Sequence, residues 1–227
     1  MKRNVIRFLV PALVAGVVAQ HPLLAQETEI ENPTALAERA VRASGSERPG
    51  HVRLDWEYAD TKGNLRGEGV ARVNPPDRFR LDFFAPGEGS MQVVLVDGRL
   101  DTLGEIEGVE IPPPAFLYAM AGVFRPGNRS PTSGQIEDGR EVLEYEYGDG
   151  AHTSFYFESG RLVRVEERQR GRVSRRIELE WGADTAWPAR AEYRDNLTPS
   201  RAKWELVEVR VATDPYPDEI YDLGPIR

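Results

Sequence analysis

Stretches in which apolar and charged residues alternate, separated by short turns, run through most of this sequence. In RFRLDF the apolar residues Phe79, Leu81 and Phe83 take every second position, and charged residues take the others. Successive side chains of a β-strand point to opposite faces of a sheet, so each such stretch predicts a strand with one apolar and one charged face. Turns such as Asp97-Gly98 connect the stretches, which favours successive antiparallel hairpins.

About ten to eleven strands follow from this pattern, together with two helices. The first helix is expected over residues 32–44, where Asn32 can cap it and Pro33 can take its first position. Its apolar residues recur at the spacing of one helix face, and they are Leu36, Ala37, Ala40 and Val41. No linker or repeat divides the strands, so we expect a mainly β (α+β) fold in a single domain over residues 27–227.

A second helix, almost wholly apolar, is expected between the prolines at 112–114 and Pro126. Its large residues, Phe116, Leu117, Met120 and Phe124, leave it with almost no polar face. Such a helix must be covered by other apolar groups, or its exposed side serves as an interaction surface.

Residues 1–26 have the form of a secretory signal peptide. Three basic residues near the start precede or enter an apolar run, and small residues after it allow cleavage after Ala19 or Ala25. The apolar run is short for a transmembrane helix, and Pro11 interrupts it. We therefore expect an exported protein; a retained membrane anchor is the less favoured alternative.

Charge and cysteine content argue against several classes of partner. The whole chain has a formal net charge of −8 at pH 7, and loss of Lys2, Arg3 and Arg7 with the signal peptide lowers this charge to −11. A protein this acidic has no general attraction for nucleic acid or for anionic membrane surfaces. The sequence contains no cysteine, so it offers neither disulfides nor a site for the lipidated cysteine of a bacterial lipid anchor.

Residues that could act in catalysis or metal binding form no recognisable motif. His51 and His152 begin separate predicted strands without a second ligand at metal-binding spacing. Carboxylate pairs such as Glu178 and Glu180 are typical of a solvated strand face. We therefore expect no enzyme activity, no metal and no cofactor.

An arginine cluster, RQRGRVSRR, extends from Arg168 to Arg176. The flanking stretches VEER and IELEW supply acids that can pair with it across a hairpin, so a solvated hairpin tip is expected. Binding of a phosphate-bearing lipid or of a partner is the alternative.

The order of the predicted elements resembles the LolA and LolB family of lipoprotein localisation factors. The matching features are the pair Gly67 and Gly69, the stretch Pro76 to Leu81, the turns Pro86-Gly87 and Asp97-Gly98, the apolar segment Phe116 to Pro126, and the final strands around Pro188 and VATDPYPDEIYDL. The resemblance covers roughly residues 32–223. It implies an unclosed antiparallel β half-barrel with helices covering its concave face.

The resemblance also implies a function: a periplasmic, noncatalytic protein that binds lipoprotein acyl chains or other lipids and carries them toward the outer membrane. Such a protein is expected to be a monomer that exchanges its cargo with inner- and outer-membrane transfer proteins. Asn74 and Pro75 stand where the soluble carriers have an arginine, and the receptors' lipidated cysteine is missing, so carrier and receptor roles both stay open.

The expected cavity wall combines the apolar faces of the first strands with the second helix. Its candidate residues are Val52, Leu54, Trp56, Phe79, Leu81, Phe83, Phe116, Leu117, Met120 and Phe124. The same pattern fits a dry, packed core equally well. A second interpretation is a regulatory or scaffold module that binds a partner protein on the same half-barrel.

Overall fold

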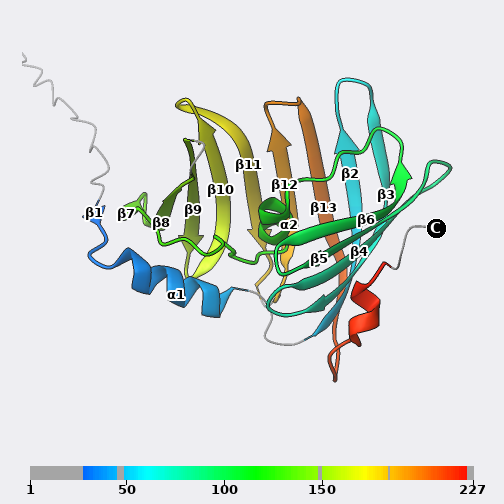
Figure 1. Ribbon diagram of the computed structural model, residues 1–227, viewed down its shortest axis with the longest axis horizontal. Helices are drawn as coiled ribbons and strands as arrows, with labels where there is room; N and C mark the ends of the chain where they lie inside the picture. Colours follow the sequence, from blue (N-terminus) through cyan, green and yellow to red (C-terminus); the bar gives the residue numbers. More distant parts are fainter. Residues whose placement is uncertain (1–27, 45–48, 148–149, 184, 224–227) are drawn as a thin grey trace, which may run out of the picture.

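Thirteen strands form one antiparallel sheet in the computed structural model (Figure 1). The structure describes residues 28–44, 49–147, 150–183 and 185–223, so the predicted signal peptide lies outside the described residues. The strands are β1 Thr28–Glu29, β2 Gly50–Ala59, β3 Asn64–Asn74, β4 Arg78–Ala85, β5 Gly89–Val96, β6 Arg99–Ile106, β7 Ser133–Glu137, β8 Arg140–Glu146, β9 Ala151–Glu158, β10 Arg161–Gln169, β11 Arg172–Trp181, β12 Pro188–Asp195 and β13 Ser200–Val211.

The strand order is β1-β7-β8-β9-β10-β11-β12-β13-β2-β3-β4-β5-β6. Two meanders, β2 to β6 and β7 to β13, are joined where β13 pairs with β2, and Trp204 lies opposite Trp56 in that pair. The outer strands are β6 at one edge and the two-residue β1 at the other, so the sheet curls without closing. This confirms the expected unclosed half-barrel.

Two strands in the sheet were not predicted, β1 and β7. Both are short, since β1 has two residues and β7 has five. They pair with each other through Thr28 opposite Ile136 and Glu29 opposite Gln135. The pairing depends on residues more than a hundred positions apart, so local alternation carries no signal for it.

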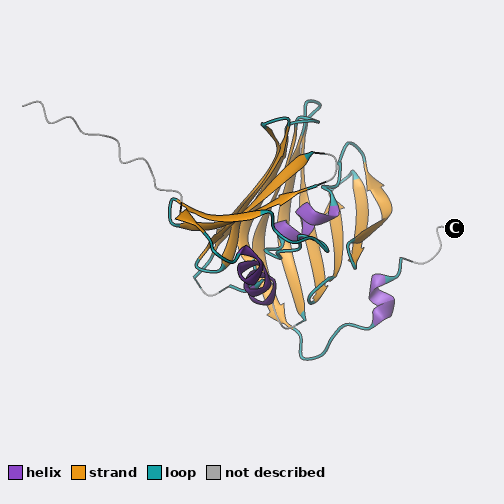
Figure 2. Ribbon diagram, turned by 60° about the vertical axis from the view of Figure 1, so that its left-hand side comes forward, coloured by secondary structure: helices purple, strands orange, loops and turns teal. Residues whose placement is uncertain are grey.

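Two α-helices, α1 Pro33–Ala43 and α2 Pro114–Met120, lie within the curl of the sheet (Figure 2), and a 3-10 helix, η1 Asp218–Tyr221, packs beside β4 and β5. The Asn32 side chain caps α1, because its oxygen accepts a hydrogen bond from the Ala35 N–H at 2.9 Å. Within the described ranges, no helix combines the length and the hydropathy needed to cross a membrane.

The helix α2 ends in a Schellman motif. The Val123 N–H donates to the Tyr118 carbonyl at 2.9 Å, and the Gly122 N–H donates to the Ala119 carbonyl at 2.8 Å. Gly122 has a φ of 78°, and a Cβ there would lie 2.5 Å from the Trp181 ring. Only glycine therefore fits at this stop, which turns the chain back onto the sheet.

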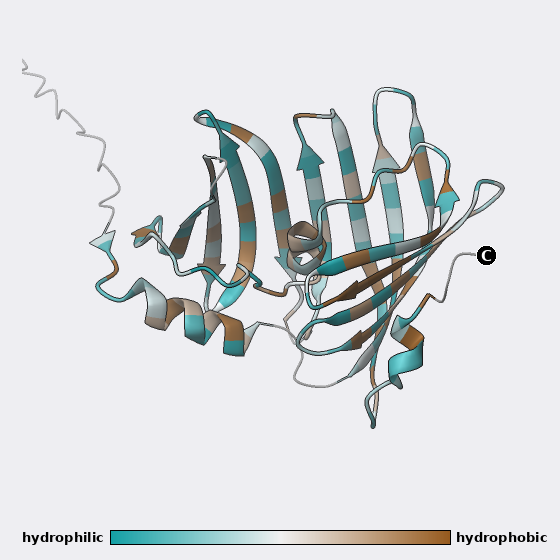
Figure 3. Ribbon diagram, viewed as in Figure 1, coloured by the Kyte–Doolittle hydropathy of each residue, from teal (hydrophilic) through white to brown (hydrophobic). Residues whose placement is uncertain are grey.

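Apolar and polar bands alternate along the strands (Figure 3), as the sequence predicts. The apolar bands face the helices and form one core that includes all of the inward residues of β2, Val52, Leu54, Trp56 and Tyr58, each at most 7% exposed. The polar bands lie on the outer face, where charged residues pair between strands, as Arg201 does with Glu57 at 2.9 Å.

The glycine pair Gly67 and Gly69 of β3 makes room for large side chains on the neighbouring strands. A Cβ at Gly67 would lie 1.9 Å from the Phe84 carbonyl oxygen and 2.7 Å from the Trp56 ring. A Cβ at Gly69 would lie 2.7 Å from a methyl group of Leu54. The inward face of the sheet can hold Trp56 only because β3 has no side chain opposite it.

Gly67→Ala should destabilise the fold by roughly 1–3 kcal/mol, because the methyl group collides with backbone that cannot move away like a side chain. Gly63→Ala is the matched control, since a Cβ at Gly63 would find no atom within 4 Å. Urea unfolding of the two variants and the parent measures the difference. Equal free energies of unfolding for both variants would contradict the packing argument.

Candidate functional site: an apolar cavity between sheet and lid

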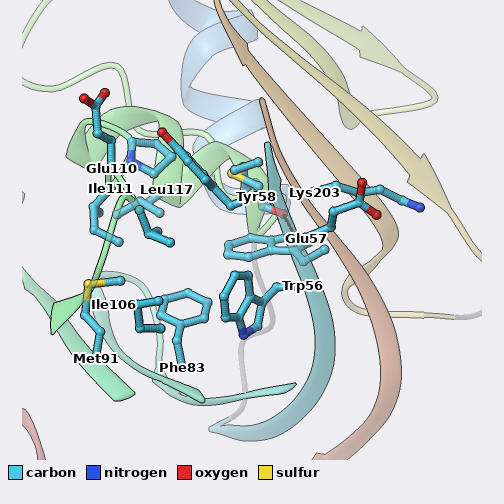
Figure 4. A pocket seen from close by; sticks show the side chains of 15 residues that line it. Trp56, Glu57, Tyr58, Phe83, Met91, Ile106, Glu110, Ile111, Leu117 and Lys203 are labelled. Atoms are coloured by element: carbon cyan, nitrogen blue, oxygen red, sulfur yellow. Dashed lines mark hydrogen bonds between the residues drawn. The ribbon is translucent and has the colours of Figure 1, made fainter. Parts of the chain in front are cut away.

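An apolar cavity of about 40 Å³ lies between the sheet, α2 and the segment 107–113 (Figure 4). Its wall comes from β2, β4, β5, β6 and β13, and the helix contributes Leu117 and Met120. The other large apolar side chains around it are Trp56, Tyr58, Phe83, Met91, Ile106, Ile111 and Trp204. Trp56 and Phe83 meet edge to face, with ring centroids 6.0 Å apart.

The charged residues at the cavity turn their side chains away from it. Glu57 and Lys203 point outward from the strands (Figure 4), where Glu57 pairs with Arg201 and Lys203 pairs with Glu205 at 2.5 Å. The interior surface is therefore almost entirely hydrocarbon and aromatic ring. Such a surface can bind an apolar group through burial and dispersion, without directional contacts.

The polar atoms of the two wall tryptophans already have partners. The Trp56 indole N–H donates to the Glu68 carbonyl at 3.0 Å, and the Trp204 indole N–H donates to the Met120 carbonyl at 3.1 Å. Neither nitrogen needs a polar ligand. The second of these hydrogen bonds also fixes the carboxyl end of α2 to β13.

All ten residues expected at the cavity wall are buried in one core, each at most 8% exposed. Trp56, Phe83, Leu117 and Met120 line the cavity itself. Phe79 lines a smaller space of about 10 Å³ nearer the other end of α2. The other five, Val52, Leu54, Leu81, Phe116 and Phe124, pack elsewhere in the same core.

Several wall residues were not predicted, among them Ile111, Ala202 and Trp204. Ala202 and Trp204 belong to an alternating stretch, but their place at the cavity depends on the pairing of β13 with β2. Ile111 belongs to a proline-rich segment without periodicity. Alternation in β13 could have marked its two residues as inward, whereas nothing local marks Ile111.

One end of α2 is anchored to the turns that precede β4 and β6. The Tyr118 hydroxyl donates to the Asp77 carbonyl at 2.8 Å and accepts from the Gly98 N–H at 3.3 Å. Arg125 forms an ion pair with Asp77 at 2.5 Å and lies over the Tyr118 ring. Burial raises the pKa of the Tyr118 phenol above its ordinary value, so the hydroxyl remains a donor at neutral pH.

Aromatic contacts hold the chain after α2 against the other half of the sheet. The Phe124 ring lies 4.9 Å from that of Phe155 and 5.1 Å from that of Phe157, measured between centroids. Phe116 meets Tyr193 of β12 at 5.5 Å. Since Tyr118 packs on Phe79 of β4 at 5.1 Å, the helix connects the two meanders across the concave face.

Histidines and carboxylates do not gather at the cavity. His51 lies on β2 and His152 on β9, and the described part of the chain contains no group of three or more histidine, aspartate and glutamate residues placed to hold a metal ion. Partial burial and then the nearby Arg72 and Arg210 guanidinium groups lower the pKa of His51.

The arginine cluster forms the β10–β11 hairpin, as predicted, and its acids pair with it across the strands. Glu166, only 2% exposed, accepts from Arg168 at 3.0 Å and from Arg176 at 2.7 Å. Arg175 lies 3.0 Å from Glu167. These acids therefore compensate Arg168, Arg175 and Arg176.

Two solved structures share this fold at low sequence identity. A LolA superfamily protein from Nitrosomonas europaea superposes with a TM-score of 0.57 at 12% identity, over 84% of this chain and 97% of that protein. A domain from Vibrio parahaemolyticus, named for outer membrane lipoprotein sorting, gives 0.54 at 10% identity, over 84% and 96%. The chain has a LolA-like fold, as the sequence resemblance implied. No protein-family model and no curated protein matches the sequence.

Tyr118→Phe should loosen the anchored end of α2, because it removes a hydroxyl that makes two hydrogen bonds. The expected loss is about 1–2 kcal/mol of unfolding free energy, with faster amide hydrogen exchange over residues 114–120. Thermal unfolding and exchange followed by mass spectrometry measure both effects.

Tyr145→Phe is the matched control. The Tyr145 hydroxyl is buried and finds no hydrogen-bond partner among the residues described here, so its removal should leave stability unchanged or raise it. Equal changes in the two variants would show that the two hydrogen bonds of Tyr118 add nothing to stability.

Proposed function

We propose that this protein binds acyl chains of lipoproteins or other lipids, without catalysis, between the sheet and α2. The observation that carries the proposal is the apolar cavity whose cover is a helix with almost no polar face. The surface of this space is almost entirely apolar, and the charged residues at its edge, Glu57 and Lys203, point away from it. This geometry supports a hydrocarbon ligand and no polar one.

Ligand uptake requires α2 and the segment 107–113 to move. The cavity of about 40 Å³ is far smaller than the roughly 300–1,000 Å³ typical of ligand sites. An acyl chain therefore replaces the contacts that Leu117 and Met120 make with the sheet. The form described here corresponds to the closed, unloaded state in this proposal.

The magnitudes allow such an exchange. An acyl chain of about fifteen methylenes gains on the order of 12 kcal/mol when it leaves water, at roughly 0.8 kcal/mol per methylene. The polar anchors of α2 are the two hydrogen bonds of Tyr118, that of Trp204, and the Arg125 to Asp77 ion pair. At about 1 kcal/mol each, they total roughly 4 kcal/mol, so the ligand can offset their loss.

The cellular setting is proposed from the sequence and the fold together. The signal peptide expected at residues 1–26 would deliver a single carrier-like domain, residues 27–227, to the periplasm. The LolA-like fold, and the name of the Vibrio domain, support a role in lipoprotein sorting toward the outer membrane. As a monomeric carrier the protein would receive cargo from one membrane transfer protein and give it to another.

Uptake can be measured directly with delipidated protein. A fluorescent fatty acid or a triacylated peptide should bind stoichiometrically, and a brominated fatty acid should quench Trp56 and Trp204, which line the cavity. Ala202→Trp should weaken binding at least tenfold, because the indole fills the space from the β13 wall. Fluorescence titration gives both values.

Val211→Trp is the control, because this residue is 56% exposed at the far end of the same strand. It should bind the fatty acid as the parent does. No uptake by the parent protein would overturn the proposal. Recovery of a specific partner protein that binds equally well after delipidation would then favour the scaffold interpretation.

A further inference from the structure

Two turns lie side by side at one end of the sheet, that between β10 and β11 and that between β12 and β13 (Figure 1). Asn196 of the second turn bonds to the strand residues that follow the first turn, Val173 and Ser174 of β11. Its backbone N–H donates to the Ser174 carbonyl at 2.8 Å, and its side-chain amide donates to the Val173 carbonyl at 2.9 Å. The two turns therefore form one connected surface.

Leu197 projects from this surface with 51% of its area exposed. The Asp195 carboxylate holds the turn, since it accepts from the Leu197 N–H at 2.7 Å and from the Thr198 N–H at 3.2 Å. Burial of Asp195 opposes its ionisation, but these bonds and that from Arg175 lower its pKa. The apolar side chain is thus held outward by a fixed turn.

Arg170 and Arg172 flank the same surface, and both are exposed. Neither has an ion-pair partner within the described ranges. Three acids lie nearby, Glu166, Glu167 and Asp195. Their side chains are largely buried and already pair with other arginines. Among the residues that the structure describes, the charges of these two arginines beside the exposed leucine are therefore uncompensated.

We propose that the arginine–leucine rim, defined as Arg170, Arg172 and Leu197, docks on an anionic phospholipid bilayer. Guanidinium groups bind phosphate oxygens in a bidentate manner, and an apolar side chain beside them can enter the interface. A protein partner needs about 800 Å² of matched surface per side, whereas a bilayer accepts a single projecting leucine. An amphipathic rim without a groove therefore fits a lipid surface.

The net charge of the chain opposes general attraction to such a bilayer, so attraction has to be local. The twelve residues of β13 span about 40 Å at roughly 3.3 Å per residue. Acids at the far end are thus several Debye lengths from a membrane at the rim, given about 8 Å in physiological salt. Of the nearer acids, Asp60 follows Ala59, which pairs with Arg201 beside the β12–β13 turn, whereas Glu88 and Glu107 lie farther across this end, at the turns next to β5 and β6. The face that approaches the bilayer is therefore the one on the side of the β10–β11 hairpin.

The rim and the cavity share one end of the molecule. Ala202, which lines the cavity, lies only five residues after Leu197, and Trp204 follows on the same strand. Docking at the rim would bring the cavity to the lipid surface. That the cavity meets the lipid surface matters only if the proposed function holds. Binding of the rim to the membrane does not rest on the proposed function.

Cosedimentation of the mature chain with vesicles tests the rim. The protein should bind vesicles of phosphatidylcholine with phosphatidylglycerol, but not phosphatidylcholine alone, and high salt should release it. Arg170→Asn with Arg172→Ser should lower the partition coefficient about 25-fold, at roughly fivefold per arginine. Leu197→Asp should also lower it, and Leu197→Ser serves if the aspartate alters thermal unfolding.

Matched controls test whether the loss of vesicle binding is specific to the rim or follows from any change of charge or hydropathy. Val207→Asp changes an equally exposed residue of β13, 51%, and Arg99→Ser removes an exposed arginine from the opposite end of the sheet. Both should bind as the parent does. Absence of binding by the parent, or equal losses in the controls, would overturn the proposal.

Fatty-acid uptake by the same variants, measured without vesicles, distinguishes the two proposals. Uptake should be unchanged when the rim is altered. Loss of vesicle binding by the rim variants, with uptake equal to that of the parent, supports the rim. Vesicle binding by a parent protein that takes up no fatty acid would remove the proposed function and leave the rim in place.

Discussion

The apolar concave face of the sheet cannot be left in water, and the rest of the structure follows from the need to cover it. Strand order supplies the cover. Because β6 and β7 lie near opposite edges, residues 107–132 must cross the sheet between them, and they cross it on the concave side. A chain crossing an apolar surface must itself be apolar, which explains a helix with buried residues on every side.

Local alternation predicted most of the strands and the inward residues on them, because the period of a strand depends only on its own sequence. Trp56 and Phe83 could be recognised in this way. Trp204 could not be placed at the cavity, since it reaches Trp56 only through the nonlocal pairing of β13 with β2. The two-residue β1 carried no signal of its own for the same reason.

The size of the cavity between the sheet and α2 could not be predicted from the sequence, for a different reason. Leu117 and Met120 touch the cavity, while Phe116 and Phe124 of the same segment fill aromatic contacts elsewhere. The sequence pattern of apolar side chains is the same whether the interior that they form is fully packed or contains a cavity. Close packing of this core is therefore settled by three-dimensional fit, to which the two glycines of β3 contribute as much as the large residues.

The cover is held unequally at its two ends. Past its midpoint α2 is bound by Tyr118, by the Trp204 hydrogen bond to Met120 and by the rings around Phe124. The start of α2 is formed by three consecutive prolines, two before the helix and Pro114 as its first residue, which have no N–H to donate. The cavity extends from Met120 and Trp204 to the residues before α2, Val109 to Pro112, on the side of the molecule that carries the arginine–leucine rim. An opening that begins there breaks the fewest polar contacts and faces the surface from which a lipid would come.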